Sequence, residues 1–462
     1  MTRLSSAALA ACISIALAIA GGAAAQPSGP GAGGPRPPSI DGLPKAPTAV
    51  ALPKLSAEIT GPGAMFDSAP SQARGLDTAH FGYVTREFFA SGTADGKPYT
   101  TRVVARMPRD ASKFSGLVLA ESMHSSGAAH MFEFTSGYLM SAGHGAVEIL
   151  TTSPAQFTAL NAKRYEKLAI ADGQQNEIIA QVAALVRAKS PLTAGAAVRK
   201  LVMAGTSMSA GTLVNYLPAH LVYRTPEMQR IFDGFLPTST GANIMEIDVP
   251  LIEMPTMHEV ETNVPRRQDS DEPGKQFRLY EVSGIGHVDA RDNVRLHPNP
   301  CVKPLSTFPH QAYYSLGLYH LLRWVDQGIP APHAARILLD RDVTNDGSAM
   351  ALDANGNPLG GIRNPYVDVA IAKYSPVNTA VEPVIANPSA YVAANGLQGA
   401  QIMCRLSAWQ EPMSAEKLKQ LYGSKRNYVG QFEKRLDELE KQGWSLSVYH
   451  DLILADAKAV DF

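Results

Sequence analysis

The sequence predicts an α/β fold with a mostly parallel central sheet that is covered by helices. Short apolar runs at residues 116–120, 145–150 and 200–204 have the length and composition of buried strands. Between them, residues 173–189 place Ile and Val side chains at helical spacing. Because 45% of the 462 residues are hydrophobic, the chain can fill a large core. Strands that alternate with helices are typical of parallel sheets with both faces covered.

The two ends of the predicted domain differ from this central pattern. Residues 84–90 and 99–105 alternate apolar and polar side chains, which predicts two antiparallel strands with a hairpin at 91–98. We therefore expect an N-terminal antiparallel extension of the sheet. After residue 204, the pattern predicts further strands and then a C-terminal helical and loop elaboration. The predicted strands are 232–237, 249–254 and 276–282, and the predicted helices are 309–326 and 414–442.

The N-terminus has the pattern of a signal peptide. Arg3 supplies the positive charge, residues 7–20 are apolar, and Ala23-Ala24-Ala25 forms a small-residue cleavage site before Gln26. The apolar run is too short for a comfortable membrane span. We therefore expect residues 1–25 to direct export to the periplasm or the medium and to be removed.

Residues 26–53 are rich in Pro, Gly and Ala and contain too little apolar surface to order themselves, so we expect a disordered leader. Residues 54–462 then form the α/β domain with its insertions. Removal of the signal peptide also removes Cys12 and leaves Cys301 and Cys404. In an oxidising compartment we expect these two to form a disulfide, the alternative being two buried thiols.

The charge balance excludes one class of partner. Forty-one basic and 42 acidic side chains give a formal net charge of −1, and no basic run of the kind that binds phosphate backbones occurs. We expect no nucleic-acid partner, and no pattern calls for a metal ion or an organic cofactor.

The most informative stretch is Gly205-Thr206-Ser207-Met208-Ser209, between an apolar strand and the start of a helix. A serine at the apex of a sharp strand-to-helix turn is the context of a nucleophile elbow. The turn needs small residues two positions on either side of the serine, and Gly205 and Ser209 fill them. The second is a serine rather than the more usual glycine. A small-residue turn without catalytic function is the alternative.

A serine nucleophile needs a histidine base, which needs an acid to orient it. His287 follows the predicted strand 276–282 through a glycine-containing loop, so it is the expected base, with His258 as its competitor. The acid should follow the strand 249–254. Glu259 is the preferred candidate and Glu261 the alternative, while Asp269 and Asp271 lie further along a polar loop.

Backbone amides should bind the oxyanion that forms during acyl transfer. We expect one from Met208, directly after the nucleophile. The other should come from the loop 122–124 after the strand 116–120, and Met123 is the expected donor. Thr238, Ser239 and Thr240 stand at a strand end, where they either line the pocket or cap the strand.

Several of these pieces together resemble a bacterial alpha/beta-hydrolase domain-containing family of exported proteins regarded as esterases. The resemblance extends from about Val84 onward, and it implies an α/β-hydrolase fold with Ser207 as nucleophile and His287 as base. It supports Glu259 as acid less directly. The chain departs from the family at Thr256-Met257-His258-Glu259 and at His124, where asparagine is commoner. The matching pieces are the loop after 116–119, 205–209, 232–234, 280–287 and 360–365.

Together these patterns predict a serine hydrolase that cleaves small or polymeric carboxylic esters through a Ser207–His287–Glu259 triad and an acyl-enzyme. Two other functions fit the same residues. One is a catalytically silent binding protein with this fold, and the other is an acyltransferase that uses the same triad.

Overall fold

The computed structural model describes residues 42–73, 75–152, 155–241, 243–262, 266–291, 296–340, 348–382 and 390–462. For 390–395 it describes the backbone alone. The predicted signal peptide, residues 1–25, and the first part of the predicted leader lie outside these ranges.

A nine-stranded sheet forms the centre of the molecule, in the order β11-β10-β9-β7-β5-β6-β4-β3-β2. The six strands from β11 to β6 run parallel, whereas β4, β3 and β2 are antiparallel to their neighbours. This confirms the predicted fold class and the N-terminal antiparallel extension. The strands are β2 (Lys54–Leu55), β3 (Tyr83–Ala94), β4 (Lys97–Pro108), β5 (Leu117–Ser122), β6 (Gly145–Ile149), β7 (Lys200–Thr206), β9 (Gly234–Thr238), β10 (Leu251–Glu253) and β11 (Phe277–Leu279).

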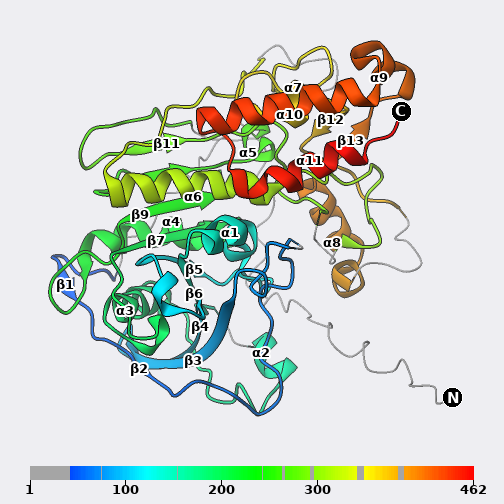
Figure 1. Ribbon diagram of the computed structural model, residues 1–462. Helices are drawn as coiled ribbons and strands as arrows, with labels where there is room; N and C mark the ends of the chain where they lie inside the picture. Colours follow the sequence, from blue (N-terminus) through cyan, green and yellow to red (C-terminus); the bar gives the residue numbers. More distant parts are fainter. Residues whose placement is uncertain are drawn as a thin grey trace.

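Alternation along the central strands separates two cores. In β5, Leu119 packs in the cluster on one face and Val118 in the cluster on the other, as expected of a strand with both faces covered. Helices α1 (His130–Ser141) and α6 (His310–Gln327) cover the first face. Helices α3 (Gln175–Arg187) and α4 (Met208–Val222) cover the second, with the smaller α2 (Ala155–Leu160) and α5 (Met257–Glu261) in loops. Figure 1 shows this layering.

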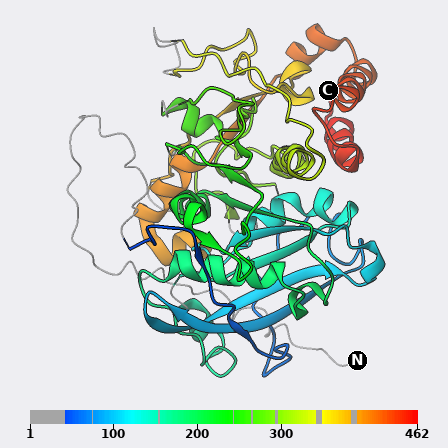
Figure 2. The same ribbon diagram turned by 90° about the vertical axis from the view of Figure 1, so that its left-hand side faces the viewer.

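The C-terminal region adds a further layer on the α1 and α6 side. Helices α10 and α11 lie side by side on the outer side of α6, as Figures 1 and 2 show from two directions. The Tyr449 hydroxyl, just before α11, bonds the Ser315 hydroxyl of α6 at 2.6 Å. This confirms the predicted C-terminal elaboration. Its elements are α7 (Pro365–Asp368), β12 (Ala372–Ser375), α8 (Ala390–Leu406), β13 (Trp409–Pro412), α9 (Ala415–Tyr422), α10 (Lys425–Gln442) and α11 (His450–Ala459).

The prediction of one continuous helix over 414–442 was wrong. Gly423, with φ 74°, ends α9, and the Ser424 side chain caps α10 by accepting a hydrogen bond from the amide of Asn427. A glycine with positive φ that ends one helix, followed by a serine that caps the next, explains the stop and restart. Tyr422 at the end of α9 and Tyr428 near the start of α10 both pack against the first core, so apolar side chains continue across the break.

The predicted leader also ends earlier than expected. β1 (Thr48–Ala49) pairs in parallel with β8 (Tyr223–Arg224), and Val50 is buried in the second core. The three residues Thr48-Ala49-Val50 therefore belong to the folded domain, although they fall within the predicted disordered range 26–53. Pairing with a distant strand supplies order that local composition does not reveal.

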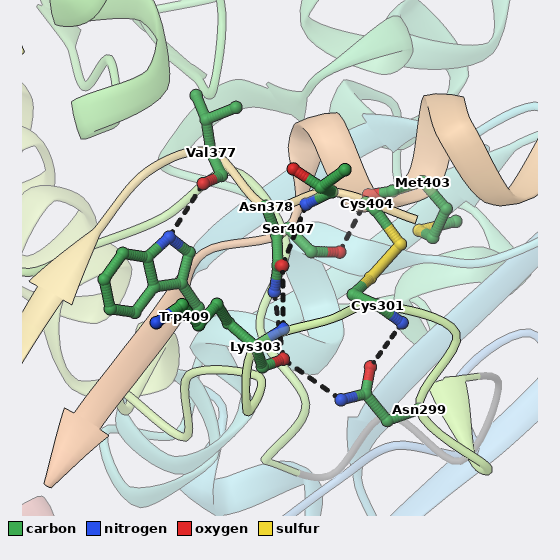
Figure 3. Close-up of a disulfide and its surroundings, with 10 residues drawn as sticks. Asn299, Cys301, Lys303, Val377, Asn378, Met403, Cys404, Ser407 and Trp409 are labelled. Atoms are coloured by element: carbon green, nitrogen blue, oxygen red, sulfur yellow. Dashed lines mark hydrogen bonds between the residues drawn. A yellow bond between two sulfur atoms is a disulfide. The ribbon is translucent and has the colours of Figure 1, made fainter. Parts of the chain in front are cut away.

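The disulfide between Cys301 and Cys404 is present, as predicted. It joins two positions 103 residues apart in a small apolar cluster (Figure 3).

Candidate active site

Ser207 occupies the turn between β7 and α4 in a strained backbone conformation. Its φ of 52° and ψ of −119° lie outside the regions that residues with a side chain favour. A Cβ added at Gly205 would lie 2.4 Å from the carbonyl oxygen of Ser209, so only glycine fits there. The turn therefore has the tight geometry expected of a nucleophile elbow.

Ser209 has a function in the turn that glycine could not have. Its hydroxyl accepts a hydrogen bond from the amide of Thr206 and donates one to the carbonyl of Thr206, both at 2.9 Å. The side chain is buried and spans the two arms of the turn. The departure from G-x-S-x-G thus adds two hydrogen bonds beneath the strained residue.

The structure brings together the three residues that the sequence predicted to form a triad. Nε2 of His287 lies 2.8 Å from the Ser207 hydroxyl oxygen, and Nδ1 of His287 lies 2.6 Å from a carboxylate oxygen of Glu259. Because a carboxylate only accepts, Nδ1 carries the proton and Nε2 is left to accept from serine. The imidazole is thereby held in the tautomer that a general base needs.

Glu259 is oriented by the first turn of α5. The Thr256 side chain caps this helix, and the second carboxylate oxygen of Glu259 accepts from the Thr256 amide at 2.8 Å and hydroxyl at 2.6 Å. Burial alone would raise the pKa of Glu259, but the hydrogen bond and charge of His287 and the bonds from Thr256 hold this pKa below its ordinary value. Glu259 is therefore an ionised partner for imidazole.

Thr256 was not among the predicted site residues, although a signal for it exists. Thr256-Met257-His258-Glu259 has the T-x-x-E spacing of a capping box, and it follows a predicted strand. The departure from the family pattern is thus a helix cap whose glutamate also bonds the histidine.

The other predicted candidates do not bond the serine or the base. Glu261 accepts from the Ser348 hydroxyl at 3.0 Å and the Ala349 amide at 2.8 Å, which fixes a neighbouring loop. Asp269 and Asp271 pair with Arg336, Arg278 and His333.

His258, the competing base, lies beside the triad without joining it. Its ring is 5.9 Å from the ring of His287 in an edge arrangement, and burial lowers its pKa. Its Nδ1 is buried without a hydrogen-bond partner in the described parts of the chain. His258 therefore packs against His287 without bonding it.

The expectation for the second oxyanion donor was wrong. The amide of Met123 donates to the carbonyl of Ile149 at 2.9 Å, and the amide of His124 donates to the carbonyl of Ala128 at 3.0 Å. The first bond continues the β5–β6 pairing and the second closes a turn within the loop, so both amides already have an acceptor. Met208, in contrast, is the first residue of α4, where backbone amides have no intrahelical acceptor.

One residue of the same loop contacts Met208, the residue directly after Ser207. The Ser125 hydroxyl lies 3.0 Å from the sulfur of Met208, and the Met208 side chain is 62% exposed. Ser125 therefore contacts the side chain of the residue that follows Ser207. Exact loop geometry of this kind has no signature in the sequence.

Thr238 and Ser239 form hydrogen bonds at the end of β9. The Thr238 hydroxyl donates to the carbonyl of Gly205 at 3.2 Å, and the Ser239 hydroxyl bonds the Tyr314 hydroxyl at 2.6 Å. Both side chains are buried, and their hydroxyls are engaged in these bonds at the end of β9, which supports the strand-cap interpretation. Thr240 is half-buried and follows them.

A hollow of about 270 Å³ lies elsewhere, between the β12–β13 ribbon and α10–α11. Ser207, His287 and Glu259 do not line it. The candidate site is therefore identified from its side-chain geometry and not from this hollow. Its walls include Arg291, Tyr366, Tyr374, Tyr428 and Asp456.

The described residues form neither a metal-binding cluster nor a membrane-spanning helix. No group of three or more His, Cys, Asp or Glu side chains in these ranges is arranged to hold a metal ion. Among the helices of the same ranges, none combines the length and the apolar character that crossing a bilayer requires.

The parallel sheet, the strained serine after β7 and the flanking helices define the α/β-hydrolase class of folds. The chain belongs to the alpha/beta hydrolase domain family, which matches residues 48–455. No curated protein significantly matches the sequence.

Solved structures with similarity to this chain include hydrolases. Esterase Est22 is 10% identical, with a TM-score of 0.28, over 41% of this chain and 68% of its own. XC6422 from Xanthomonas campestris, described as an α/β serine hydrolase without lid, is 15% identical, with a TM-score of 0.27, over 42% and 83%. A cold-adapted esterase from an Arctic intertidal metagenomic library is 15% identical, with a TM-score of 0.24, over 43% and 83%.

Proposed function

We propose that this protein is a serine hydrolase that cleaves carboxylic esters through an acyl-enzyme intermediate. One observation carries the proposal: the unbroken hydrogen-bond chain from Ser207 through His287 to Glu259, with distances of 2.8 Å and 2.6 Å. In this arrangement a weak alcohol nucleophile gains a base, and the base gains an orienting acid.

The proposed reaction has two halves. Ser207 Oγ attacks the acyl carbon while Nε2 of His287 takes the hydroxyl proton, and the ester oxygen then leaves with that proton as an alcohol. Water attacks the acyl-enzyme in the second half, again giving its proton to Nε2, and the acid is released. Glu259 stabilises the imidazolium that forms in each half without itself taking the proton.

We propose that the amides of Met208 and Ser125 bind the oxyanion. The Met208 amide is free of intrahelical bonding, and the Ser125 side chain contacts Met208. The amides of Met123 and His124 are engaged in backbone bonds, which leaves Ser125 as the next residue of the loop. Hydrogen bonds aimed at the developing charge are commonly the largest electrostatic contribution to acyl transfer.

We also propose that the protein acts after export, as the pattern in residues 1–25 predicts. The Cys301–Cys404 disulfide supports this, because disulfides persist in oxidising compartments. N-terminal sequencing of the exported protein should begin at Gln26. A protein that retains Met1 and stays in the cytoplasm would contradict export.

The proposal is tested by turnover of p-nitrophenyl esters from acetate to decanoate, beside Ser207→Ala. We expect the wild type to hydrolyse at least the shorter esters and the variant to lose this activity. Added alcohol as acceptor distinguishes acyl transfer from hydrolysis by the ester product. A folded wild type without turnover would favour the silent binding protein.

A further inference from the structure

The base is held by a segment of chain more than 100 residues away from it in sequence. Directly after His287, the amide of Val288 donates to the carbonyl of Leu406 at 3.1 Å, and the carbonyl of Val288 accepts from the amide of Ala408 at 3.0 Å. Residues 406–408 thus pair with the backbone that carries His287. We call residues 404–408 the support segment.

The support segment also touches the residue before the base. A Cβ added at Gly286 would lie 2.1 Å from the Cβ of Ala408, which shows how closely the two backbones approach. The carbonyl of Ala408 accepts from Ser306 at 2.9 Å, and the carbonyl of Ser306 accepts from Ala290 at 2.8 Å. The support segment therefore contacts the base loop at Gly286 and Val288, and through Ser306 at Ala290.

The disulfide anchors the beginning of this segment. Cys404 is its first residue, and its carbonyl accepts from the amides of Ser407 at 3.0 Å and Asn378 at 3.2 Å. Across the sulfur bridge, which Figure 3 shows, Cys301 lies in a strand-like pairing with Ala380. The bridge therefore joins two backbone pairings, one of which continues to the base.

Apolar packing around the bridge is limited. The apolar cluster around the bridge is small and consists of Ala290, Leu296, Cys301, Leu305, Ala380, Ala400 and Cys404, three of which are alanines. Because hydrophobic stabilisation grows with buried apolar area, such a cluster contributes far less than the two main cores. A covalent tie across 103 residues restricts the segment where packing is weak.

We propose that the Cys301–Cys404 disulfide positions His287 for catalysis, acting through the support segment. This inference rests on the proposed function, because it assigns His287 the part of the base. A base displaced by a fraction of an ångström from serine reacts more slowly, whereas substrate affinity changes little. Loss of the bridge should therefore lower kcat and leave KM nearly unchanged.

The test compares three variants of the full chain with the oxidised wild type. Cys301→Ala/Cys404→Ala removes the bridge without leaving a thiol. Ala408→Val keeps the bridge and pushes on Gly286. Trp409→Phe is the control, because it loses the bond from the indole Nε1 to the carbonyl of Val377 at 2.7 Å in the same region and leaves the support segment intact. Each variant is assayed for kcat, KM, the rate of fluorophosphonate labelling and thermal unfolding.

We expect kcat and the labelling rate of the cysteine variant and of Ala408→Val to fall about tenfold, with KM within about twofold of wild type. Trp409→Phe should unfold at a lower temperature and keep its kcat. A folded cysteine variant whose kcat and labelling match the wild type would overturn the proposal. So would an equal loss of kcat in Trp409→Phe, which would indicate general destabilisation.

Two further experiments ensure that each result either supports or overturns the proposal. If the cysteine variant does not fold, reduction of the folded wild type by dithiothreitol decides, with opening of the bridge checked by mass spectrometry, because it breaks the same bond without a substitution. An unchanged kcat after reduction would overturn the proposal. Labelling of the oxidised wild type, absent in Ser207→Ala, tests the proposed function separately. Failure of that labelling would contradict the proposed esterase function. Normal labelling of the wild type, together with variants whose kcat and labelling rate are unchanged, would contradict only the positioning of His287 by the disulfide.

Discussion

The proposed nucleophile, Ser207, and the proposed base, His287, are held in place in two different ways. Ser207 is fixed by its neighbours in sequence, since Gly205 and Ser209 on either side create the turn and bond across it. His287 is fixed by distant residues, namely Glu259 of α5 on one side and the support segment on the other. A short motif therefore specifies the serine, while the histidine depends on the assembled fold.

The largest effect should come from a substitution in the turn that holds Ser207. Gly205→Ala would put a Cβ 2.4 Å from the Ser209 carbonyl oxygen, a backbone atom that cannot move without unwinding the start of α4. We expect loss of ester hydrolysis by about a thousandfold or failure to fold. Gly211→Ala is the matched control, because an added Cβ there meets nothing within 4 Å. Equal activity of the two variants would contradict the tight elbow.

The second largest effect should come from Glu259→Gln, which tests how distant residues hold His287. The amide cannot hold the imidazole in its reactive tautomer, so we expect kcat to fall by about 10²- to 10⁴-fold. Glu261→Gln serves as control, since its carboxylate bonds Ser348 and the Ala349 amide, and it should keep kcat within about threefold of wild type. Steady-state kinetics on one p-nitrophenyl ester measure both. A larger loss of kcat in Glu261→Gln than in Glu259→Gln would assign the acid to Glu261 instead.

These two regions also show what the sequence could predict. The elbow, His287 after its strand and the Cys301–Cys404 pair were predictable because each depends on local pattern or on elimination. The amide of Met123 was assigned wrongly, because its acceptor, the carbonyl of Ile149, becomes adjacent only when β5 and β6 pair. No spacing rule reveals such a partner.

Pairings between distant segments account for the other differences. Thr48–Ala49 is ordered by β8, and nothing in residues 26–53 announces that pairing. The support segment next to His287 was equally invisible, since Val288 and Ser407 are separated by more than 100 residues. Local periodicity alone also concealed the break at Gly423.

Acid should weaken the whole fold through buried histidines, a moderate effect that acts on both regions. Burial lowers the pKa of His144 to about 4, and the pKa of His320 likewise to about 4. The unfolded chain takes up these protons below about pH 6.5, whereas the folded chain does so only near pH 4. Stability should therefore fall as pH drops from about 6.5 to about 4, by up to about 3 kcal/mol for each histidine.

Urea unfolding at pH 4.5 and pH 7 measures this acid sensitivity. His144→Gln should reduce the difference in unfolding free energy between the two pH values. His80→Gln, at an exposed position, should leave the difference unchanged. An unaltered pH dependence in His144→Gln would contradict the assignment.

The smallest effect should come from Ser209→Ala. It removes the two hydrogen bonds to Thr206 inside the elbow, and we expect a loss of about 1 to 2 kcal/mol in unfolding free energy. Because Gly205 still shapes the turn, kcat should fall by less than about tenfold. Chemical denaturation and kinetics on the same preparation test this. Unchanged stability would show that Ser209 is only a small residue at a crowded position.

The central claim is that Ser207 is activated by His287 and Glu259. The most direct measurement is the intact mass of the folded wild type after treatment with a fluorophosphonate, followed by peptide mapping. The account predicts one adduct per chain, located on Ser207, and much slower labelling in His287→Ala. An adduct on another serine, or a folded wild type that takes up no label, would contradict it.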